Sequence, residues 1–178
     1  MKEQGMLDIV FVCHGNICRS PMAEYYFRKL VKDDGYESVI RVSSAATSRE
    51  EIGNPVYPLA KRILATKGIG CRGKVACQLT HDMAEQADYI VVMDKMNYAS
   101  VLSMFGEGVV SKTVLLLDFA DDCHKEMRGC DVADPWYTRD FERAWHDITI
   151  GCDGLLKRLV AETDLRAMPN SVQLGAEK

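Results

Sequence analysis

A cysteine and an arginine stand six positions apart in a short polar segment, Cys13 and Arg19. A mostly apolar run, Leu7 to Val12, precedes the segment and a helical pattern follows it, which predicts a tight loop between a strand and a helix. The loop amides and the positive end of the helix dipole would converge there and suit a dianion. Because a cysteine in such a field ionises readily, we expect Cys13 to be a nucleophile that faces an oxyanion held by Arg19.

Each of these residues also has an ordinary structural explanation. A cysteine at the end of a buried strand is usually a small apolar side chain, and an arginine at a helix start is usually a solvated charge. The rest of the loop favours the chemical interpretation. Gly15 and Asn16 tolerate left-handed backbone, and Ser20 followed by Pro21 is typical of a helix cap and first turn. The glycine and lysine spacing of a Walker nucleotide loop is absent.

The loop resembles the signature of the low-molecular-weight protein tyrosine phosphatases, since it reads Val12-Cys13-x-Gly15-Asn16-Ile17-Cys18-Arg19-Ser20-Pro21-x-Ala23-Glu24. The segment Asp134-Pro135-Trp136-Tyr137 is similar to the second motif of that family. The likeness runs from about Leu7 to Val160 and includes residues 44–48 and 52–55. It implies a phosphatase that hydrolyses phosphotyrosine through a phosphocysteine.

That chemistry assigns a role to three residues. Attack by the Cys13 thiolate would form the phosphocysteine, while Arg19 and the loop amides brace the phosphoryl oxygens. Asp134 would protonate the leaving group and later activate water. A lone aspartate before proline is otherwise a plain turn residue. The remaining predicted site comprises His14, Gly15, Asn16, Ile17, Cys18, Ser20, Glu50, Trp136 and Tyr137 for substrate binding and Ser44 for support of the loop.

Several of these assignments have alternatives. Trp136 and Tyr137 would form an aromatic wall for a phenyl ring, or they would pack in the core. Tyr137 also resembles a tyrosine that some family members have phosphorylated. Asn16, Ser20 and Ser44 resemble the polar residues that hold the family's loop in shape, with Ser20 donating to the thiolate, and ordinary turn bonding is their alternative.

The sequence departs from the family at the mouth of the site and behind the loop. Arg49, Glu50 and Glu51 stand where an aromatic residue is frequent, so we expect negative charge there and a preference for basic residues beside the phosphotyrosine. A histidine that is usual after the second predicted helix is missing, and Gly73 and Lys74 occupy its region.

Cys18 resembles a resolving cysteine, which would trap oxidised Cys13 as a disulfide; a small buried side chain is the alternative. Cys71 and Cys77 leave open an arsenate reductase, an enzyme class of similar fold whose loop usually has a polar residue at the position of Ile17. A protein-arginine phosphatase, which typically has threonine there, is a second alternative. A phosphate-binding module without turnover is the third, and retention of the cysteine, arginine and aspartate together argues against it.

Composition narrows the remaining classes. The 178 residues suit one domain, and a net charge of −4 gives no general attraction to nucleic acid or anionic membrane. Seven cysteines without a paired spacing indicate a reduced, cytoplasmic protein with no metal site, and the four histidines show no ligand spacing. Neither a signal peptide nor a membrane span is predicted. We expect no cofactor, a phosphotyrosine protein or small aryl phosphate as substrate, and a monomer or weak dimer.

The apolar pattern predicts an α/β single domain with a four-stranded parallel sheet flanked by helices and the phosphate loop after the first strand. Cys13, residues 43–44 and Asp94 would share the carboxyl edge of that sheet. Gly151 and Gly154 should weaken the last helix by roughly 1 kcal/mol each unless close packing compensates. The expected phosphatase domain spans 1–164, with a flexible tail at 165–178. Strands are expected at 7–12, 39–42, 88–93 and 114–117, and helices at 21–33, 59–66, 80–86, 95–105 and 141–160.

Overall fold

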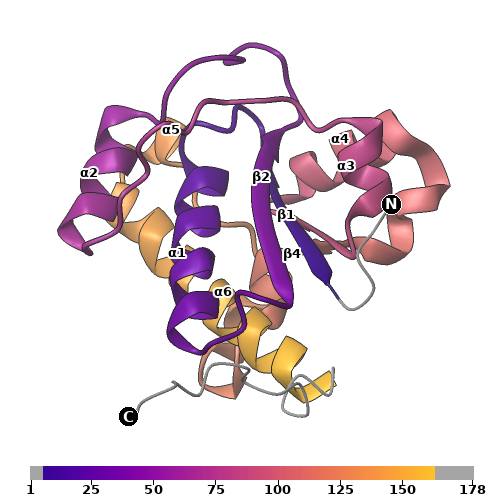
Figure 1. The fold of residues 1–178 in the computed structure, drawn as a ribbon. Coiled ribbons are helices and arrows are strands. Elements are labelled where there is room, and N and C mark those ends of the chain that lie inside the picture. Colours follow the sequence, from indigo (N-terminus) through magenta and orange to yellow (C-terminus); the bar gives the residue numbers. More distant parts are fainter. Residues whose placement is uncertain (1–5, 163–178) are drawn as a thin grey trace, which may run out of the picture.

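The structure, a computed structural model, describes residues 6–162 and contains one four-stranded parallel sheet (Figure 1). The strand order is β2-β1-β3-β4, which confirms the predicted fold class. The tail predicted at 165–178 and the end of the predicted domain at 164 lie outside the described residues. The strands are β1 (Leu7–Cys13), β2 (Ile40–Ala46), β3 (Tyr89–Val92) and β4 (Thr113–Leu115).

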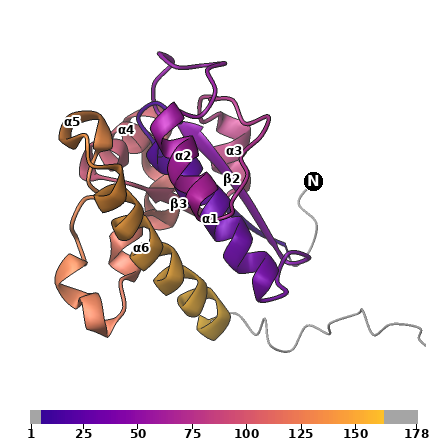
Figure 2. The same cartoon turned by 90° about the vertical axis from the view of Figure 1, so that its left-hand side faces the viewer.

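Helices cover both faces of the sheet. Figure 2 shows α1, α2 and α6 together on one side, with α3 and α4 behind them. The α-helices are α1 (Arg19–Asp33), α2 (Pro58–Thr66), α3 (His81–Gln86), α4 (Lys95–Phe105), α5 (Pro135–Thr138) and α6 (Phe141–Glu162), and the 3-10 segments are η1 (Gly106–Lys112), η2 (Leu116–Phe119) and η3 (Asp122–Met127). No helix within residues 6–162 is long and apolar enough to cross a membrane.

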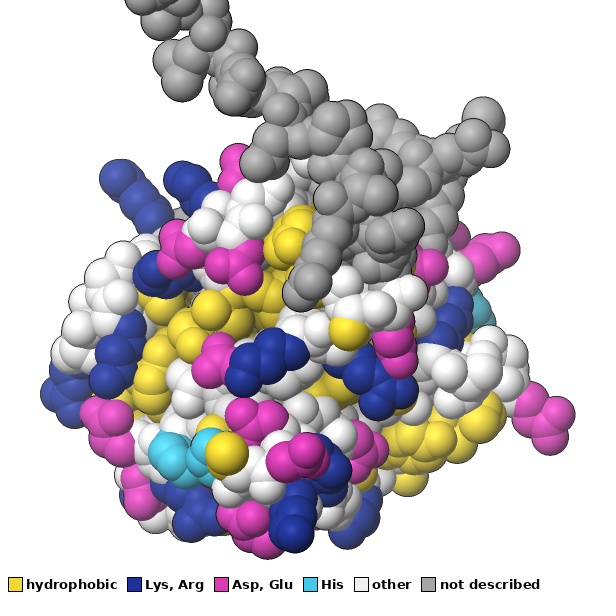
Figure 3. Space-filling model, turned by 90° about the horizontal axis from the view of Figure 1, so that it is seen from below, with side chains coloured by type: hydrophobic (Ala, Val, Ile, Leu, Met, Phe, Trp, Pro, Cys, Tyr) yellow, Lys and Arg dark blue, Asp and Glu magenta, His cyan; other side chains and the backbone are white. Residues whose placement is uncertain are grey.

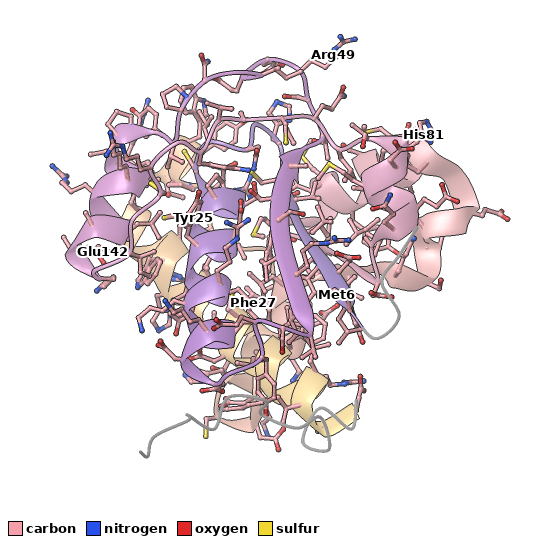
Figure 4. All side chains as sticks on the ribbon, in the orientation of Figure 1. Met6, Tyr25, Phe27, Arg49, His81 and Glu142 are labelled. Atoms are coloured by element: carbon pink, nitrogen blue, oxygen red, sulfur yellow. The ribbon has the colours of Figure 1, made fainter. Side chains whose placement is uncertain are left out.

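The period of two along β1 divides the core between the two faces. Phe11 packs with the residues of α1 and α6, whereas Val10 and Val12 pack with those of α3 and α4. The ring of Phe11 meets that of Phe27 edge to face at 5.5 Å between centroids. Figure 4 shows Phe27 on the side of α1 that faces the sheet. Both faces of β1 are therefore buried up to Cys13, its last residue.

Close packing explains the two glycines in the middle of α6. A Cβ on Gly154 would lie 1.7 Å from the carbonyl oxygen of Phe119, and one on Gly151 would lie 2.5 Å from Cγ of Leu116. Close packing therefore compensates for the two glycines, since η2 approaches the backbone of α6 at a place where a side chain would block it.

Two strand ends differ from the prediction by more than one residue. The second strand continues to Ala46, so Ser43 and Ser44 lie inside β2 and not after it. Its end has neighbours on both sides, because it pairs with β1 and the amide of Ala46 donates to the carbonyl of Cys77 at 2.8 Å. The fourth strand stops at Leu115, because Leu116 and Leu117 enter the 3-10 turn that packs on α6.

Side-chain caps begin two of the helices. Thr80 precedes α3 and accepts from the amide of Met83 at 3.2 Å. Asp94 follows β3 and accepts from the amide of Asn97 at 2.6 Å, which starts α4 at the carboxyl edge of the sheet. The carboxylate of Asp94 is thereby held beside the loop that follows β1.

The face at the other end of the strands has a different character. Figure 3 shows apolar side chains gathered there among charged ones. A shallow pocket between the end of α1 and α6 is lined by Leu30, Asp34, Tyr36, Asp153, Leu156, Lys157 and Val160. Neither a cysteine nor an arginine lines that pocket, so the predicted chemistry lies at the carboxyl edge.

Candidate active site

The loop between β1 and α1 wraps around the sulfur of Cys13. Cys13 is the last residue of β1 and is buried, and the amide of Asn16 points at its Sγ from 3.3 Å. Asn16 has a φ of 58°, as the sequence suggested, whereas Gly15 does not adopt the left-handed region. Gly15 is explained by close approach instead, since a Cβ there would lie 3.2 Å from Cγ of Glu51.

Ser20 does not cap the helix as predicted. The helix begins at Arg19, and Cys18 in the cap position has no side-chain cap bond. The hydroxyl of Ser20 lies 3.0 Å from Sγ of Cys13 and receives a hydrogen bond of 2.9 Å from Nδ2 of Asn16. The hydroxyl of Ser20 therefore contacts the sulfur of Cys13 and does not cap the helix.

Arg19 is buried and held between two carboxylates. Its Nη1 donates to Asp94 at 2.7 Å and its Nη2 donates to Asp134 at 2.6 Å. Burial lowers the pKa of Arg19, but the negative charges of Cys13, Asp134 and Asp94 outweigh it and leave the pKa above its ordinary value. The guanidinium is therefore a fixed positive charge beside Cys13.

Asp134 is positioned by the short helix α5. It occupies the cap position, where its Oδ1 accepts from the amide of Trp136 at 2.9 Å, and Pro135 takes the first helical position. The side chain remains 25% exposed and reaches Arg19 through Oδ2. The second motif thus contributes its carboxylate to the same site as the loop, although 115 residues separate Arg19 from Asp134.

A pocket of about 310 Å³ opens above the loop. Trp136 is 50% exposed and Tyr137 83% exposed on one wall, so these two rings do not pack in the core. Glu50 stands at the mouth, where it contacts the imidazole of His14 at 3.1 Å. Figure 4 shows Arg49 extending away from the molecule. The pocket is lined by Cys13, His14, Gly15, Ile17, Cys18, Arg19, Glu50, Glu51, Asp94, Met96, Asn97, Asp134, Trp136 and Tyr137.

Three predicted site residues lie beneath this pocket. Asn16 and Ser20, which we expected to contact substrate, are buried below the loop together with Ser44. Nδ2 of Asn16 donates to Oγ of Ser44 at 2.8 Å, and Oδ1 of Asn16 accepts from the amide of Cys77 at 3.2 Å. Their contacts hold the shape of the loop.

The cysteines near the loop have different environments. Cys18 lines the pocket but is only 8% exposed, and burial, followed by the negative charge of Cys13, raises its pKa to about 12. Cys71 belongs to the apolar core, whereas Cys77 is exposed. Cys18 is therefore a neutral thiol at neutral pH.

The structure adds residues to which the sequence assigned no role. The sequence placed Asp94 at the carboxyl edge of the sheet without a role, and the structure shows it as a carboxylate partner of the buried Arg19. Glu24 is buried within the apolar face of α1, and Lys74 reaches it at 3.1 Å from the segment between α2 and α3. The available signal for Glu24 was its place at the end of the family signature, Ala23-Glu24. Within residues 6–162, no cluster of three or more potential ligand residues could hold a metal ion.

Comparison with known proteins places this geometry in a family. The model described as "Low molecular weight phosphotyrosine protein phosphatase" matches residues 8–165. The chain is 39% identical over 160 residues to the low-molecular-weight protein-tyrosine-phosphatase YfkJ of Bacillus subtilis, covering 90% of this chain and 100% of that one. It is 33% identical over 161 residues to PtpA of Staphylococcus aureus, covering 90% and 99%.

Solved structures agree with the sequence relatives. The crystal structure of YfkJ from Bacillus subtilis superposes with a TM-score of 0.83 and covers 90% of this chain and 99% of that one. A structure of the YwlE arginine phosphatase, at 28% identity, has a TM-score of 0.75 and covers 89% and 99%. The fold therefore does not by itself separate phosphotyrosine from phosphoarginine chemistry.

Proposed function

The chain belongs to the low-molecular-weight phosphotyrosine protein phosphatase family, and on that premise we propose that Cys13 is its nucleophile and Arg19 and Asp134 its other catalytic residues. The observation that carries the proposal is the convergence on one sulfur. The amide of Asn16 and the hydroxyl of Ser20 both reach Sγ of Cys13, at 3.3 and 3.0 Å. Donors aimed at a sulfur stabilise a thiolate, which is the form that attacks phosphorus.

The reaction proceeds in two steps. The thiolate of Cys13 attacks phosphorus, the bond to the leaving oxygen breaks, and Asp134 supplies the proton that this oxygen needs. Water then attacks the phosphocysteine, Asp134 takes its proton, and the thiolate leaves with inorganic phosphate as product. Arg19 and the loop amides balance the charge on the three other phosphoryl oxygens in both steps.

The ion pair between Arg19 and Asp134 bears on how substrate engages the site. A phosphate dianion is a stronger bidentate partner for a guanidinium than one shared carboxylate. We infer that bound phosphate takes Nη2 of Arg19 from Asp134, while Nη1 stays with Asp94. Asp134 then loses a neighbouring positive charge and gains a neighbouring negative one, and both changes favour its protonated, acidic form.

The pocket walls favour an aryl phosphate. Trp136 and Tyr137 offer exposed rings, and Ile17 provides an apolar contact for a phenyl ring where a guanidinium would need a polar partner. Glu50 and Glu51 at the mouth should repel acidic flanking residues and favour basic ones. We therefore propose a phosphotyrosine protein as substrate over phosphoarginine.

Oxidation provides a means of control. Peroxide converts the thiolate of Cys13 to a sulfenic acid, and the sulfur of Cys18 then displaces water to form a disulfide within the loop. Loss of the negative charge on Cys13 removes one of the causes that raise the pKa of Cys18, which makes Cys18 a better nucleophile after the oxidation. All seven cysteines are free, which suits a reduced compartment, and we propose a cytoplasmic monomer or weak dimer.

A panel of substrates tests the proposed function. We expect turnover of a phosphotyrosine peptide and of p-nitrophenyl phosphate, with far slower hydrolysis of phosphoserine and phosphoarginine peptides and no reduction of arsenate. Preference for phosphoarginine would support the alternative that the YwlE likeness raises. Arsenate reduction that needs Cys71 or Cys77 would instead support the reductase, and phosphate binding without any turnover would support a binding module.

A further inference from the structure

A buried ion pair lies behind the phosphate loop at the side opposite the pocket. Glu24 is 2% exposed, and Oε2 of its carboxylate lies 3.1 Å from Nζ of Lys74 while Oε1 lies 2.6 Å from Nη2 of Arg28. The side chain of Lys74 is only 12% exposed and also donates to the carbonyl of Ser44 at 3.1 Å. A buried carboxylate stays charged only when it is paired, so these cations maintain the charge on Glu24.

The charged Glu24 dictates the direction of a hydrogen bond. The hydroxyl of Ser44 lies 2.5 Å from Oε2 of Glu24, and an ionised carboxylate only accepts, so Ser44 must donate to it. Because the one hydroxyl proton of Ser44 is used in that bond, its Oγ can only accept from its other neighbour, Nδ2 of Asn16 at 2.8 Å. The amide group of Asn16 is thereby held with its nitrogen towards the two serines.

The same logic continues to the reacting sulfur. Nδ2 of Asn16 also donates to Oγ of Ser20 at 2.9 Å, while Oδ1 of Asn16 is occupied by the amide of Cys77. Ser20 therefore receives a proton from Asn16 and must use its own proton elsewhere. Its neighbours are Sγ of Cys13 at 3.0 Å and the carbonyl of Ala45 at 3.5 Å, of which the sulfur is much the better placed. Each step fixes the next one.

We propose that Lys74 is a positioning residue for the phosphatase reaction, which acts through Glu24, Ser44, Asn16 and Ser20 to aim a hydroxyl proton at Cys13. Lys74 touches no reacting atom. It sets the direction, donor to acceptor, of this series of hydrogen bonds. The last donor, the hydroxyl of Ser20, stabilises Cys13 both as the attacking thiolate and as the leaving thiolate of the second step. The proposal rests on the proposed function for its catalytic meaning, but its effect on the sulfur is measurable without substrate.

Lys74 is the decisive cation because of its location. Arg28 lies on the same helix as Glu24, four residues on, and is 48% exposed, so solvent weakens its hold on the carboxylate. Lys74 comes from the connection between α2 and α3 and binds the oxygen of Glu24 that Ser44 also uses. It also lies three residues before Cys77, whose amide donates to Oδ1 of Asn16.

Alkylation of Cys13 by iodoacetamide at pH 6 tests the proposal directly. We expect Lys74→Met to slow alkylation by about tenfold, the size expected when one hydrogen bond to a charged group is misdirected. Lys74→Arg should keep the alkylation rate within about twofold of the wild-type rate, since a guanidinium can also donate to Oε2 of Glu24 and to the carbonyl of Ser44. Lys67→Met is the matched control, because Lys67 is exposed on the same connection, and it should leave the rate unchanged.

Two further measurements separate this role from a merely structural one. With p-nitrophenyl phosphate, kcat of Lys74→Met should fall about tenfold while KM stays within about twofold, because the phosphate contacts are retained. In a Ser44→Ala background, Lys74→Met should cause little additional loss of alkylation rate, since the hydrogen bonds of Ser44 to Glu24 and Asn16 are already absent. Urea unfolding verifies that each variant is folded.

The proposal is overturned if folded Lys74→Met alkylates at the wild-type rate, if Lys74→Arg is as slow as Lys74→Met, or if the losses from Lys74→Met and Ser44→Ala multiply. Failure of the wild-type protein to hydrolyse any aryl phosphate would refute the proposed function. The alkylation rates would still report whether Lys74 controls the sulfur, so the two failures are distinguishable.

Discussion

Replacement of Asp134 by asparagine isolates its proton from its structural role. Asparagine keeps an oxygen that can accept from the amide of Trp136, now at 2.9 Å from Oδ1, so the cap of α5 survives. The change removes the acid and the charge beside Arg19. We therefore expect a large kinetic effect with little loss of stability, in contrast to Asp134→Ala, which also loses a cap worth about 1 kcal/mol.

The magnitude depends on the leaving group. A tyrosine leaves as a phenolate of pKa about 10 and needs the proton, so the turnover of a phosphotyrosine peptide should fall by about 10²–10⁴, or about 3 to 5 kcal/mol of transition-state stabilisation. The more acidic p-nitrophenol needs the proton far less, and its ester should be slowed much less. The fall in kcat/KM at alkaline pH that marks a protonated acid should disappear in the variant.

The assay compares kcat/KM for both esters across pH, with Asp140→Asn as the matched control. Asp140 lies near Asp134 and also accepts from a helix amide, that of Arg143 at 2.8 Å, but does not line the pocket. Its variant should retain both activities. Equal slowing of both esters by Asp134→Asn would refute the role of general acid and leave Asp134 as a residue that shapes the loop.

Four other tests have defined outcomes. Gly154→Ala should lower the free energy of unfolding in urea by at least about 1–3 kcal/mol, because its Cβ would overlap the carbonyl oxygen of Phe119 at 1.7 Å; a variant as stable as wild type would contradict the packing of η2 on α6. The pKa of Cys18 near 12 means that it stays a neutral thiol at pH 8, so iodoacetamide should label Cys13 there and spare Cys18. After peroxide, Cys18→Ser should not regain activity with a thiol reductant, whereas wild type should through a Cys13–Cys18 disulfide; peptide mapping that finds Cys13 joined elsewhere would contradict this. Glu50→Lys should shift the preferred flanking residues of a phosphotyrosine peptide from basic to acidic, and an unchanged preference would exclude Glu50 from specificity.

The part of the site that the sequence predicts is the part encoded locally. The strand, loop and helix around Cys13 follow one another within the chain, and their apolar periods and turn residues indicate them directly. The position of Asp94 at the same edge follows from the rule that parallel strands present their carboxyl ends together. These elements needed no partner distant in the sequence.

Local patterns did not predict the supporting contacts because their partners are distant, and only the family resemblance suggested that Asn16, Ser20 and Ser44 support the loop. Ser44 reads as a loop residue, yet it lies in β2 because its backbone pairs with β1 and its hydroxyl meets Glu24. Ser20 reads as a cap, yet the sulfur of Cys13 takes its hydroxyl. Lys74 has no local signal at all, since its role depends on a carboxylate fifty positions away. Tertiary contacts decided each of these positions against local propensity.

The covalent intermediate is the central claim, and rapid acid quench with peptide mass spectrometry tests it most directly. Wild-type protein mixed with p-nitrophenyl phosphate and quenched within a turnover should carry one phosphoryl group on the peptide that contains Cys13. Cys13→Ser should release no p-nitrophenol catalytically while it still binds phosphate or vanadate, because Arg19 and the loop amides remain. A phosphoryl group on any other residue, or substantial turnover by Cys13→Ser, would contradict the account.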